Sequence, residues 1–361
     1  MSPSLDVVLS RRSLVKSSVA AGAVAAVPFS FRGVSAQDDI VVTMVTDTTG
    51  LGDQNFNDLA NKGGTEAAAE FGITWQVIES VDQASYVPNL TSGAEAGQLT
   101  VAVGFLLMDA VAEISAQFPD TFFVFIDGVV ENGNVQSVLF REEQIGYLAG
   151  VLSGLKTTTN KIGIVGGERI PPVIRYEVGF VAGVRSVNEE AEVVINYTDT
   201  FGDQALGKET AAAQFNQDCD IVFPIAGLTG TGVYLAVAEL NRPGELWVVG
   251  VDTAQDHLAP GYELCVAQKG VDFAVYEACK QVVEGNFETG ILNLGLAEGG
   301  VSMVTYEGRT TEETNALMRG YQQAIIDGTI VPPVDDDTLA AFEIPEQPAP
   351  IEATPEASPS S

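Results

Sequence analysis

Short runs of β-branched and aromatic residues alternate with amphipathic stretches along most of this chain. The runs that favour strands fall at 40–46, 74–79, 99–105, 121–127, 135–140, 161–165, 192–197, 220–225, 246–251 and 264–267. Between them lie stretches with helical spacing, such as 57–71, 108–117, 142–155, 175–188, 203–217 and 230–240. Regular strand–helix–strand order requires crossovers between parallel strands, and runs that are apolar on both faces belong in sheets covered by helices on both sides. The pattern predicts an α/β fold with doubly wound parallel sheets.

The series divides into two similar halves, which predicts two lobes. We expect an N-terminal lobe over 40–140, with 264–290 returning to it, and a C-terminal lobe over 141–263, with 300–330 returning to it. In doubly wound sheets, ligands bind beyond the carboxyl ends of the strands. Several predicted strands end there in polar or glycine residues, so two half-sites would face each other across a cleft. A hinge between the lobes would let that cleft close.

Charge and reactive residues limit the classes of function. The 361-residue chain has 49 acidic and 17 basic residues, a net charge of −32, and such a surface repels nucleic acid and anionic headgroups. Cys219, Cys265 and Cys279 fit no zinc pattern, and the single histidine, His257, has no evident nucleophile partner. We therefore expect no catalytic residue, no metal and no cofactor. A Cys265–Cys279 bridge and buried free thiols are both open at this point.

Both ends of the chain differ from the alternating middle. Residues 1–36 contain a twin-arginine pair, a mildly apolar stretch and small residues up to Ala36, which predicts a twin-arginine signal peptide. No cysteine follows it, so we expect export without a lipid anchor to the periplasm or cell surface, and no membrane insertion of the mature chain. Residues 343–361 are rich in Pro, Ala, Ser and Glu and predict a disordered tail.

Two aromatic residues stand in polar loops at equivalent places in the two halves. Phe56 follows the first predicted strand, in a loop where Gly50 and Gly52 permit an unusual path. Phe201 lies in the polar loop 198–203 after a strand of the second half. Each ring can stack on a flat ligand or pack inward as a hydrophobic anchor. If both stack, they would sandwich a nucleobase, and each face would contribute about 1–3 kcal/mol.

Other strand ends carry polar or glycine residues that have both a binding and a structural interpretation. The amides of 227–232 can face a polar ligand at a helix N-terminus or form a tight turn. Asp252 can accept hydrogen bonds from two hydroxyl groups or cap a helix. Lys269 is either a ligand contact or a solvated lysine. The segment 202–208 nearly matches a phosphate-binding loop, but Glu209 stands where that motif needs Ser or Thr, so we interpret the match as chance.

Taken in order, these motifs resemble the basic membrane protein (BMP) family of purine-nucleoside-binding proteins that serve ABC importers. The resemblance covers 40–306, and its marks are the loop 47–57, the stretches 140–150, 162–167 and 175–183, the Phe201-x-Asp203 pair, 227–232, 250–252 and Lys269. It implies a type I periplasmic-binding-protein fold with two lobes and a hinge. It also implies an extracytoplasmic protein that captures a nucleoside and hands it to an ABC transporter permease.

The resemblance implies roles for single residues as well. Phe56 and Phe201 would stack on the purine. The other ligand contacts it implies are Asp47 and Asn57 near the base, Asp252 and Lys269 on the ribose, and Asp127 and Gly227 as further contacts. We expect a monomer without enzymatic activity. The alternatives are a binder of sugars or another small polar solute on the same fold, and a nucleoside-processing enzyme. The family's lipobox cysteine has no counterpart here, and Gly and Leu enter the first loop where acidic residues are usual.

Overall fold

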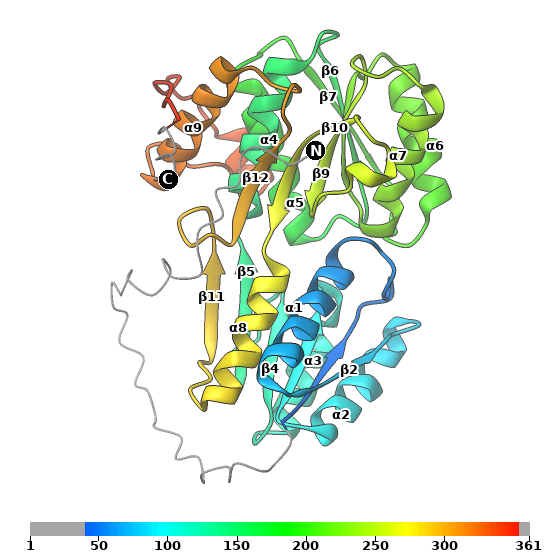
Figure 1. Cartoon of the computed structure of the whole chain (residues 1–361), viewed down its shortest axis with the longest axis vertical. Helices are drawn as coiled ribbons and strands as arrows, with labels where there is room; N and C mark the ends of the chain where they lie inside the picture. Colours follow the sequence, from blue (N-terminus) through cyan, green and yellow to red (C-terminus); the bar gives the residue numbers. More distant parts are fainter. Residues whose placement is uncertain (1–39, 354–361) are drawn as a thin grey trace, which may run out of the picture.

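The computed structural model describes residues 40–353, so the predicted signal peptide at 1–36 and positions 354–361 of the predicted tail lie outside the described residues. Within that range, two α/β lobes follow one another along the long axis of the molecule (Figure 1). Each lobe contains a six-stranded sheet with helices on both faces, which confirms the predicted fold class.

The two sheets are wound in the same order. The first contains, from edge to edge, β11 (Gly290–Leu294), β5 (Val135–Phe140), β4 (Phe122–Ile126), β3 (Leu99–Val103), β1 (Val41–Val45) and β2 (Thr74–Ile78). The second contains β12 (Val301–Thr305), β10 (Glu263–Lys269), β9 (Trp247–Asp252), β8 (Ile221–Ile225), β6 (Lys161–Gly166) and β7 (Glu192–Tyr197). Neighbouring strands are parallel except β12, which is antiparallel to β10. The direction of winding therefore reverses between β1 and β3 and again between β6 and β8, where such sheets open a crevice for ligands.

Pairs of helices cover each face of each sheet. On the first sheet the pairs are α1 (Phe56–Phe71) with α8 (Val271–Glu284), and α2 (Tyr86–Ala96) with α3 (Met108–Gln117). On the second they are α4 (Glu142–Lys156) with α5 (Pro171–Arg185), and α6 (Gln204–Asn216) with α7 (Gly227–Leu240). Outside these lie α9 (Glu312–Ile326) against α4 and the short α10 (Asp336–Ala340) against α5. The central strands of both sheets are almost wholly buried, which explains their continuous apolar sequences, whereas the edge strands β2, β7 and β11 are half-buried or exposed.

The described chain passes between the lobes three times: after β5, after β10, and between β11 and β12. Three adjacent crossing segments form the connection about which two such lobes can rotate. The predicted residue limits of the lobes stay a prediction. One detail differs, because the strand expected to return to the first lobe at 264–267 is β10, which pairs with β9 and β12 in the second sheet. The return to the first lobe therefore begins with α8.

Glycines bring α4 and α5 into backbone contact. A Cβ atom on Gly150 would lie 2.1 Å from the carbonyl oxygen of Phe180, and one on Gly183 would lie 2.0 Å from that of Tyr147. Real Cβ atoms do not approach backbone oxygens so closely, so larger residues at either position would force the two helices apart. The motif glycines at 146–150 and 179–183 thus hold α4, and the acidic residues at its first turn, at a fixed depth beside the crossing segments.

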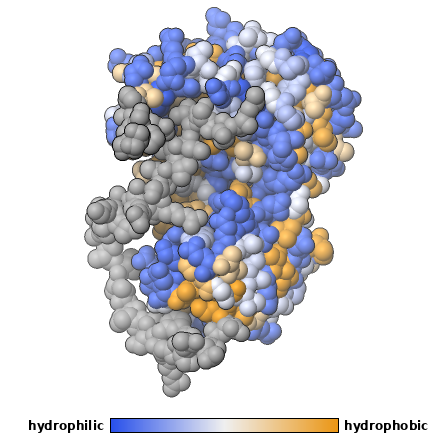
Figure 2. All heavy atoms as spheres, viewed as in Figure 1, coloured by the Kyte–Doolittle hydropathy of each residue, from blue (hydrophilic) through white to orange (hydrophobic). Residues whose placement is uncertain are grey.

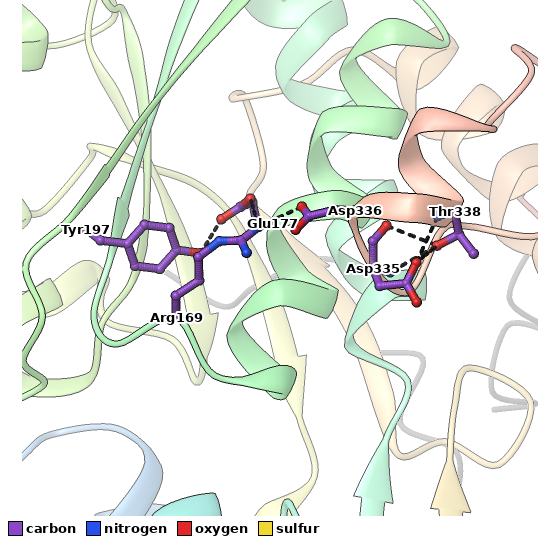
Figure 3. A network of polar contacts seen from close by, with 6 residues as sticks. All are labelled: Arg169, Glu177, Tyr197, Asp335, Asp336 and Thr338. Atoms are coloured by element: carbon purple, nitrogen blue, oxygen red, sulfur yellow. Dashed lines mark hydrogen bonds and ion pairs between the residues drawn. The ribbon is translucent and has the colours of Figure 1, made fainter.

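The C-terminal segment of the second lobe is tied down by polar contacts. The guanidinium of Arg169 lies 2.6 Å from the carboxylate of Asp336 on α10 and 3.3 Å from that of Glu177, which also accepts a hydrogen bond from Tyr197 (Figure 3). Residues 343–353 form no helix or strand, but the amide of Ile351 donates to a carbonyl of α9 at 2.8 Å. This part of the predicted disordered tail therefore docks on α9.

Three further expectations concern cysteines, surface and membrane. Cys219, Cys265 and Cys279 are buried free thiols, so the Cys265–Cys279 bridge does not form. Most of the face in Figure 2 is hydrophilic, and apolar side chains are more frequent on the first lobe than on the second. Among residues 40–353, every helix is too short or too polar to cross a bilayer.

Candidate ligand-binding cleft

A cavity lies between the lobes, at the carboxyl ends of the strands on both sides of the winding reversals. It holds about 620 Å³ of empty space, including its opening to solvent. All of the predicted ligand contacts line it: Asp47, Phe56, Asn57, Asp127, Phe201, Gly227, Asp252 and Lys269. Their contact with a ligand stays a prediction, but the fold brings every one of them to one place.

The loop after β1 is organised by a buried aspartate that the sequence analysis passed over. Asp53 is 1% exposed, and its carboxylate accepts hydrogen bonds from the amides of Asn55, Asn57 and Asp58 at 2.8–3.1 Å. It therefore caps the first turn of α1, because the side chain of the N-cap residue, Asn55, makes no capping hydrogen bond. The signal was in the sequence, because an aspartate stands three residues before the first residue of α1, at Phe56.

Asp47 and Asn57 form the polar floor of this half of the cavity. The amide nitrogen of Asn57 donates to Asp47 at 3.0 Å and to Asp53 at 3.1 Å, which fixes the orientation of its side chain. The backbone amide of Thr49 also donates to Asp47, at 2.9 Å. Burial raises the pKa of Asp47 to about 6 and also raises the pKa of Asp53. At neutral pH, Asp47 is thus a weakly hydrated carboxylate with lone pairs that can accept further hydrogen bonds.

The two aromatic rings enter the cavity from opposite lobes. Phe56 is the first residue of α1, and Phe201 lies in the loop between β7 and α6. Neither is buried in a lobe interior; both are partly exposed and line the same cavity. A glycine lies behind each ring. A Cβ on Gly104 would lie 3.6 Å from the Phe56 ring, and a Cβ on Gly167 would lie 2.4 Å from the Phe201 ring.

A cluster of charges forms the wall nearest the crossing segments. The ammonium group of Lys269 lies 2.7 Å from the carboxylate of Asp127, in the other lobe, and 2.9 Å from that of Glu142. Glu142 in turn lies 2.6 Å from the guanidinium of Arg175. Burial alone would lower the pKa of Lys269, but Asp127 and Glu142 raise it above its ordinary value. Burial raises the pKa of Glu142, yet Lys269 and Arg175 outweigh burial and lower it. Lys269 is therefore a buried, permanently charged residue rather than a solvated lysine.

Two aspartates on this wall adopt left-handed backbone conformations. Asp127 follows β4 with φ 74°, and Asp252 ends β9 with φ 60°. Such conformations are uncommon outside glycine and concentrate at functional sites. One carboxylate oxygen of Asp127 is buried without a hydrogen-bond partner, and Asp252 accepts from the hydroxyl of Tyr176 at 3.1 Å. Burial raises the pKa of Asp127, and it raises the pKa of Asp252 to about 7.

Gly227 is the first residue of α7 and has φ 53°, so it turns the chain from β8 into the helix beside Phe201. The N-terminus of α7 therefore lies at the cavity, and recognition of a polar ligand by its amides stays a prediction. The sequence analysis missed the other lining residues, which include Tyr176 and the apolar residues 105–106, 170 and 172–173. Tyr176 lay inside the motif 175–183, where its position beside Arg175 gave no sign that it lines the cavity.

Comparison with known proteins gives one consistent result. The sequence profile described as "ABC transporter substrate-binding protein PnrA-like" matches residues 40–335. The nucleoside-binding protein BmpA of an ABC transporter from Lactococcus lactis is 33% identical, covering 82% of this chain and 89% of that protein. A CD4+ T-cell-stimulating antigen of Listeria monocytogenes is 32% identical, covering 82% and 88%. A crystal structure of an ABC transporter solute-binding protein from Aeropyrum pernix matches with a TM-score of 0.77 and 30% identity, covering 84% of this chain and 96% of that one.

The same comparison corrects our prediction of localisation. Three archaeal relatives, from Pyrococcus horikoshii, P. abyssi and P. furiosus, are 32–33% identical over 74–75% of this chain and are described as lipoproteins. They contradict the expectation of twin-arginine export to the periplasm or cell surface without a lipid anchor. That expectation took a missing cysteine after Ala36 as decisive, and we withdraw it.

Proposed function

Because the chain belongs to the PnrA-like family of ABC transporter substrate-binding proteins, we propose that it captures a purine nucleoside between its lobes and presents it to an importer permease. The observation that carries this proposal is the pair of phenyl rings, Phe56 and Phe201, that reach one cavity from opposite lobes. A planar base between them would gain about 1–3 kcal/mol from each face. The pair would form only when the lobes are closed, so stacking would couple binding to closure.

The wall nearest the crossing segments, which contains Asp127, Asp252 and Lys269, supports recognition of hydroxyl groups. Asp127 and Asp252 offer carboxylate oxygens to the cavity, and one oxygen of Asp127 is buried without a partner. A buried acceptor without a donor is costly, and a ligand hydroxyl would remove that cost. Two acceptors, one from each lobe, suit two neighbouring hydroxyl groups such as those of ribose. The fixed charge of Lys269 lies between them and would restrain both carboxylates.

The polar floor formed by Asp47 and Asn57 favours a ligand that contains a heterocyclic base over a simple sugar. Asp47 and Asn57 lie on the Phe56 side of the cavity and together offer acceptors and donors to the edge of a heterocycle. A sugar would satisfy the wall of aspartates but would leave these groups and two ring faces without partners. The expected process is reversible capture, because no histidine, cysteine or serine is among the described residues that line the cavity.

The experiment is isothermal titration of the protein with inosine, guanosine and adenosine, and with ribose and galactose as representatives of the alternative. We expect micromolar or tighter binding of at least one nucleoside, which corresponds to about −8 kcal/mol or better. Phe56→Ala and Phe201→Ala should each weaken that binding by about 10-fold or more. Phe287→Ala is the matched control, because Phe287 stacks on Phe122 in the first lobe, away from the cavity.

Two results would replace the proposal. Binding of a sugar but of no nucleoside would make the protein a sugar-binding member of the fold. Release of free base from a nucleoside, detected by chromatography after incubation, would make it an enzyme. Unchanged affinity in both phenylalanine variants would reject stacking as the source of binding.

A further inference from the structure

The lobes meet at a second place, outside the cavity. The side-chain amide of Gln255, in the second lobe, donates to the backbone carbonyl of Gln54, in the first, at 3.1 Å. The imidazole nitrogen of His257 lies 3.2 Å from the side-chain oxygen of Gln54. None of the three residues lines the cavity. They join the loop between β1 and α1 to the loop after β9, on the side of the cleft away from the crossing segments (Figure 1).

The first-lobe side of this contact is held in position before the lobes meet. Gln54 has φ 55°, a left-handed conformation that costs energy for a residue other than glycine. Asp58 maintains it, because its carboxylate oxygens accept the amides of Gly52 and Gln54, each at 2.9 Å. The carbonyl of Gln54 is thereby directed at the opposite lobe by contacts made wholly within its own.

The second-lobe side rests on a buried carboxylate. Glu263, on β10, has no solvent exposure, and it accepts the backbone amide of Gln255 at 3.0 Å and the hydroxyl of Tyr234 at 2.5 Å. Tyr306 donates to its other oxygen. This arrangement fixes the short 3₁₀ turn Asp256–Leu258, which Arg309 also holds through Asp256 at 2.8 Å. Gln255 is 2% exposed, whereas Gln54 is exposed, so the hydrogen bond between them is partly buried.

We propose that Gln54, Gln255 and His257 form a clasp that keeps the cleft closed and so sets how long the ligand stays, without touching it. The proposal rests on the function proposed above. Both sides are rigid within their own lobes, so opening the cleft breaks the contacts between lobes and leaves the rest of each loop intact. The three residues act on the ligand only indirectly, because they hold the two lobes in the closed position. Their loss should therefore raise the dissociation rate and leave the association rate unchanged.

The test uses variants that remove one hydrogen-bonding group each. Gln255→Met keeps the length of the side chain but removes the donor to Gln54. His257→Leu removes the second contact, and His257→Gln restores a donor. Gln323→Met is the matched control, because Gln323 donates to Asp327 within the second lobe at 2.8 Å. Stopped-flow measurements with the nucleoside that binds wild type most tightly give both rate constants, and small-angle scattering of the ligand-free protein gives its degree of opening.

We expect Gln255→Met to raise the dissociation rate roughly 5-fold and His257→Leu by less, because His257 is exposed. His257→Gln and Gln323→Met should behave like wild type, and the melting temperature of the ligand-free proteins should not change. An unchanged dissociation rate in Gln255→Met would overturn the clasp. If wild type binds none of the nucleosides, the proposed function fails by itself. In that case scattering decides the clasp: a larger radius of gyration in Gln255→Met supports it, and an equal one overturns it.

Discussion

Asp127 and Asp252 occupy matching places in the two lobes and differ in their charge environment. Each follows or ends the fourth strand of its lobe in chain order, each has positive φ, and each lines the cavity. Asp127 forms an ion pair with the ammonium group of Lys269 at 2.7 Å, whereas Asp252 accepts a hydrogen bond from the neutral hydroxyl of Tyr176 and feels the charge of Lys269 only from further away. The cation that neutralises the first-lobe aspartate comes from the second lobe.

The two half-sites therefore share the backbone geometry of their aspartates but differ in how the charge of each aspartate is stabilised. Asp127 is paired with Lys269 across the lobes, so closure is what brings the cation to it. Asp252 has a pKa raised by burial to about 7, so it changes charge near neutral pH. The ion pair of Asp127 therefore depends on closure of the lobes, and the charge of Asp252 depends on pH.

The largest effect is expected when the cation beside Asp127 is removed, so that neither aspartate forms an ion pair. Lys269→Met leaves Asp127 buried without a cation, and it leaves Glu142 with Arg175 alone. Breaking one side of a buried ion pair typically costs about 3–5 kcal/mol, so we expect the free energy of unfolding at pH 8 to fall by that amount. The loss should be smaller at pH 5 than at pH 8, because burial raises the pKa of Asp127 and a proton on this carboxyl would remove the unpaired buried charge. Urea denaturation at the two pH values measures both.

The control for this variant is Lys208→Met. Lys208 pairs with Glu239 at an exposed position, where removing the charge should change the free energy of unfolding by less than about 1 kcal/mol. Equal losses in the two variants would show that the buried pair at the wall has no special weight, and the contrast between Asp127 and Asp252 would then lose its physical basis.

An intermediate effect should appear in the pH dependence. Burial raises the pKa of Asp252 and of Glu143 to about 7 and that of Asp47 to about 6. These three groups thus hold more protons in the folded state than in the unfolded state, so the stability that they contribute is greatest at low pH and is lost as pH rises from their unfolded pKa values near 4 through 6 to 7. Each such group contributes a slope of at most about 1.4 kcal/mol per pH unit.

Asp252→Asn should reduce that slope, since an amide needs no proton to be uncharged in the same position. Urea denaturation of wild type and variant at pH 5, 6, 7 and 8 measures it, with the exposed Asp120→Asn as control. A stability of wild type that rises between pH 5 and 8, or a slope unaffected by Asp252→Asn, would contradict the charge assigned to this aspartate.

The sequence predicted the fold and many of the residues that line the cavity, because both depend on the order of strands and helices along the chain. Alternating strands and helices fix the winding of each sheet, and the carboxyl end of each strand is known once the strand is known. The residues that it missed act through contacts between elements that are far apart in the chain. Glu142, Arg175 and Tyr176 gain their roles only when α4 and α5 pack beside β9 and β10 in the second lobe. The contact between Gln54 and Gln255 joins residues 201 positions apart, which no local pattern marks.

The smallest expected effect concerns how the two rings are held. Phe56 begins α1, whose first turn is fixed by the hydrogen bonds to Asp53, whereas Phe201 lies on a loop against Gly167 and Gly227. In Gly167→Ala, the new Cβ would lie 2.4 Å from the Phe201 ring, so the ring must move, while Phe56 stays in place. We expect nucleoside binding to weaken by about 1–2 kcal/mol, part of one stacking face. Isothermal titration measures this loss, and Gly133→Ala is the control, because no atom lies within 4 Å of a Cβ there. Wild-type affinity in Gly167→Ala would mean that the second-lobe ring contributes no face to the ligand, and that the two lobes differ in recognition as well as in charge.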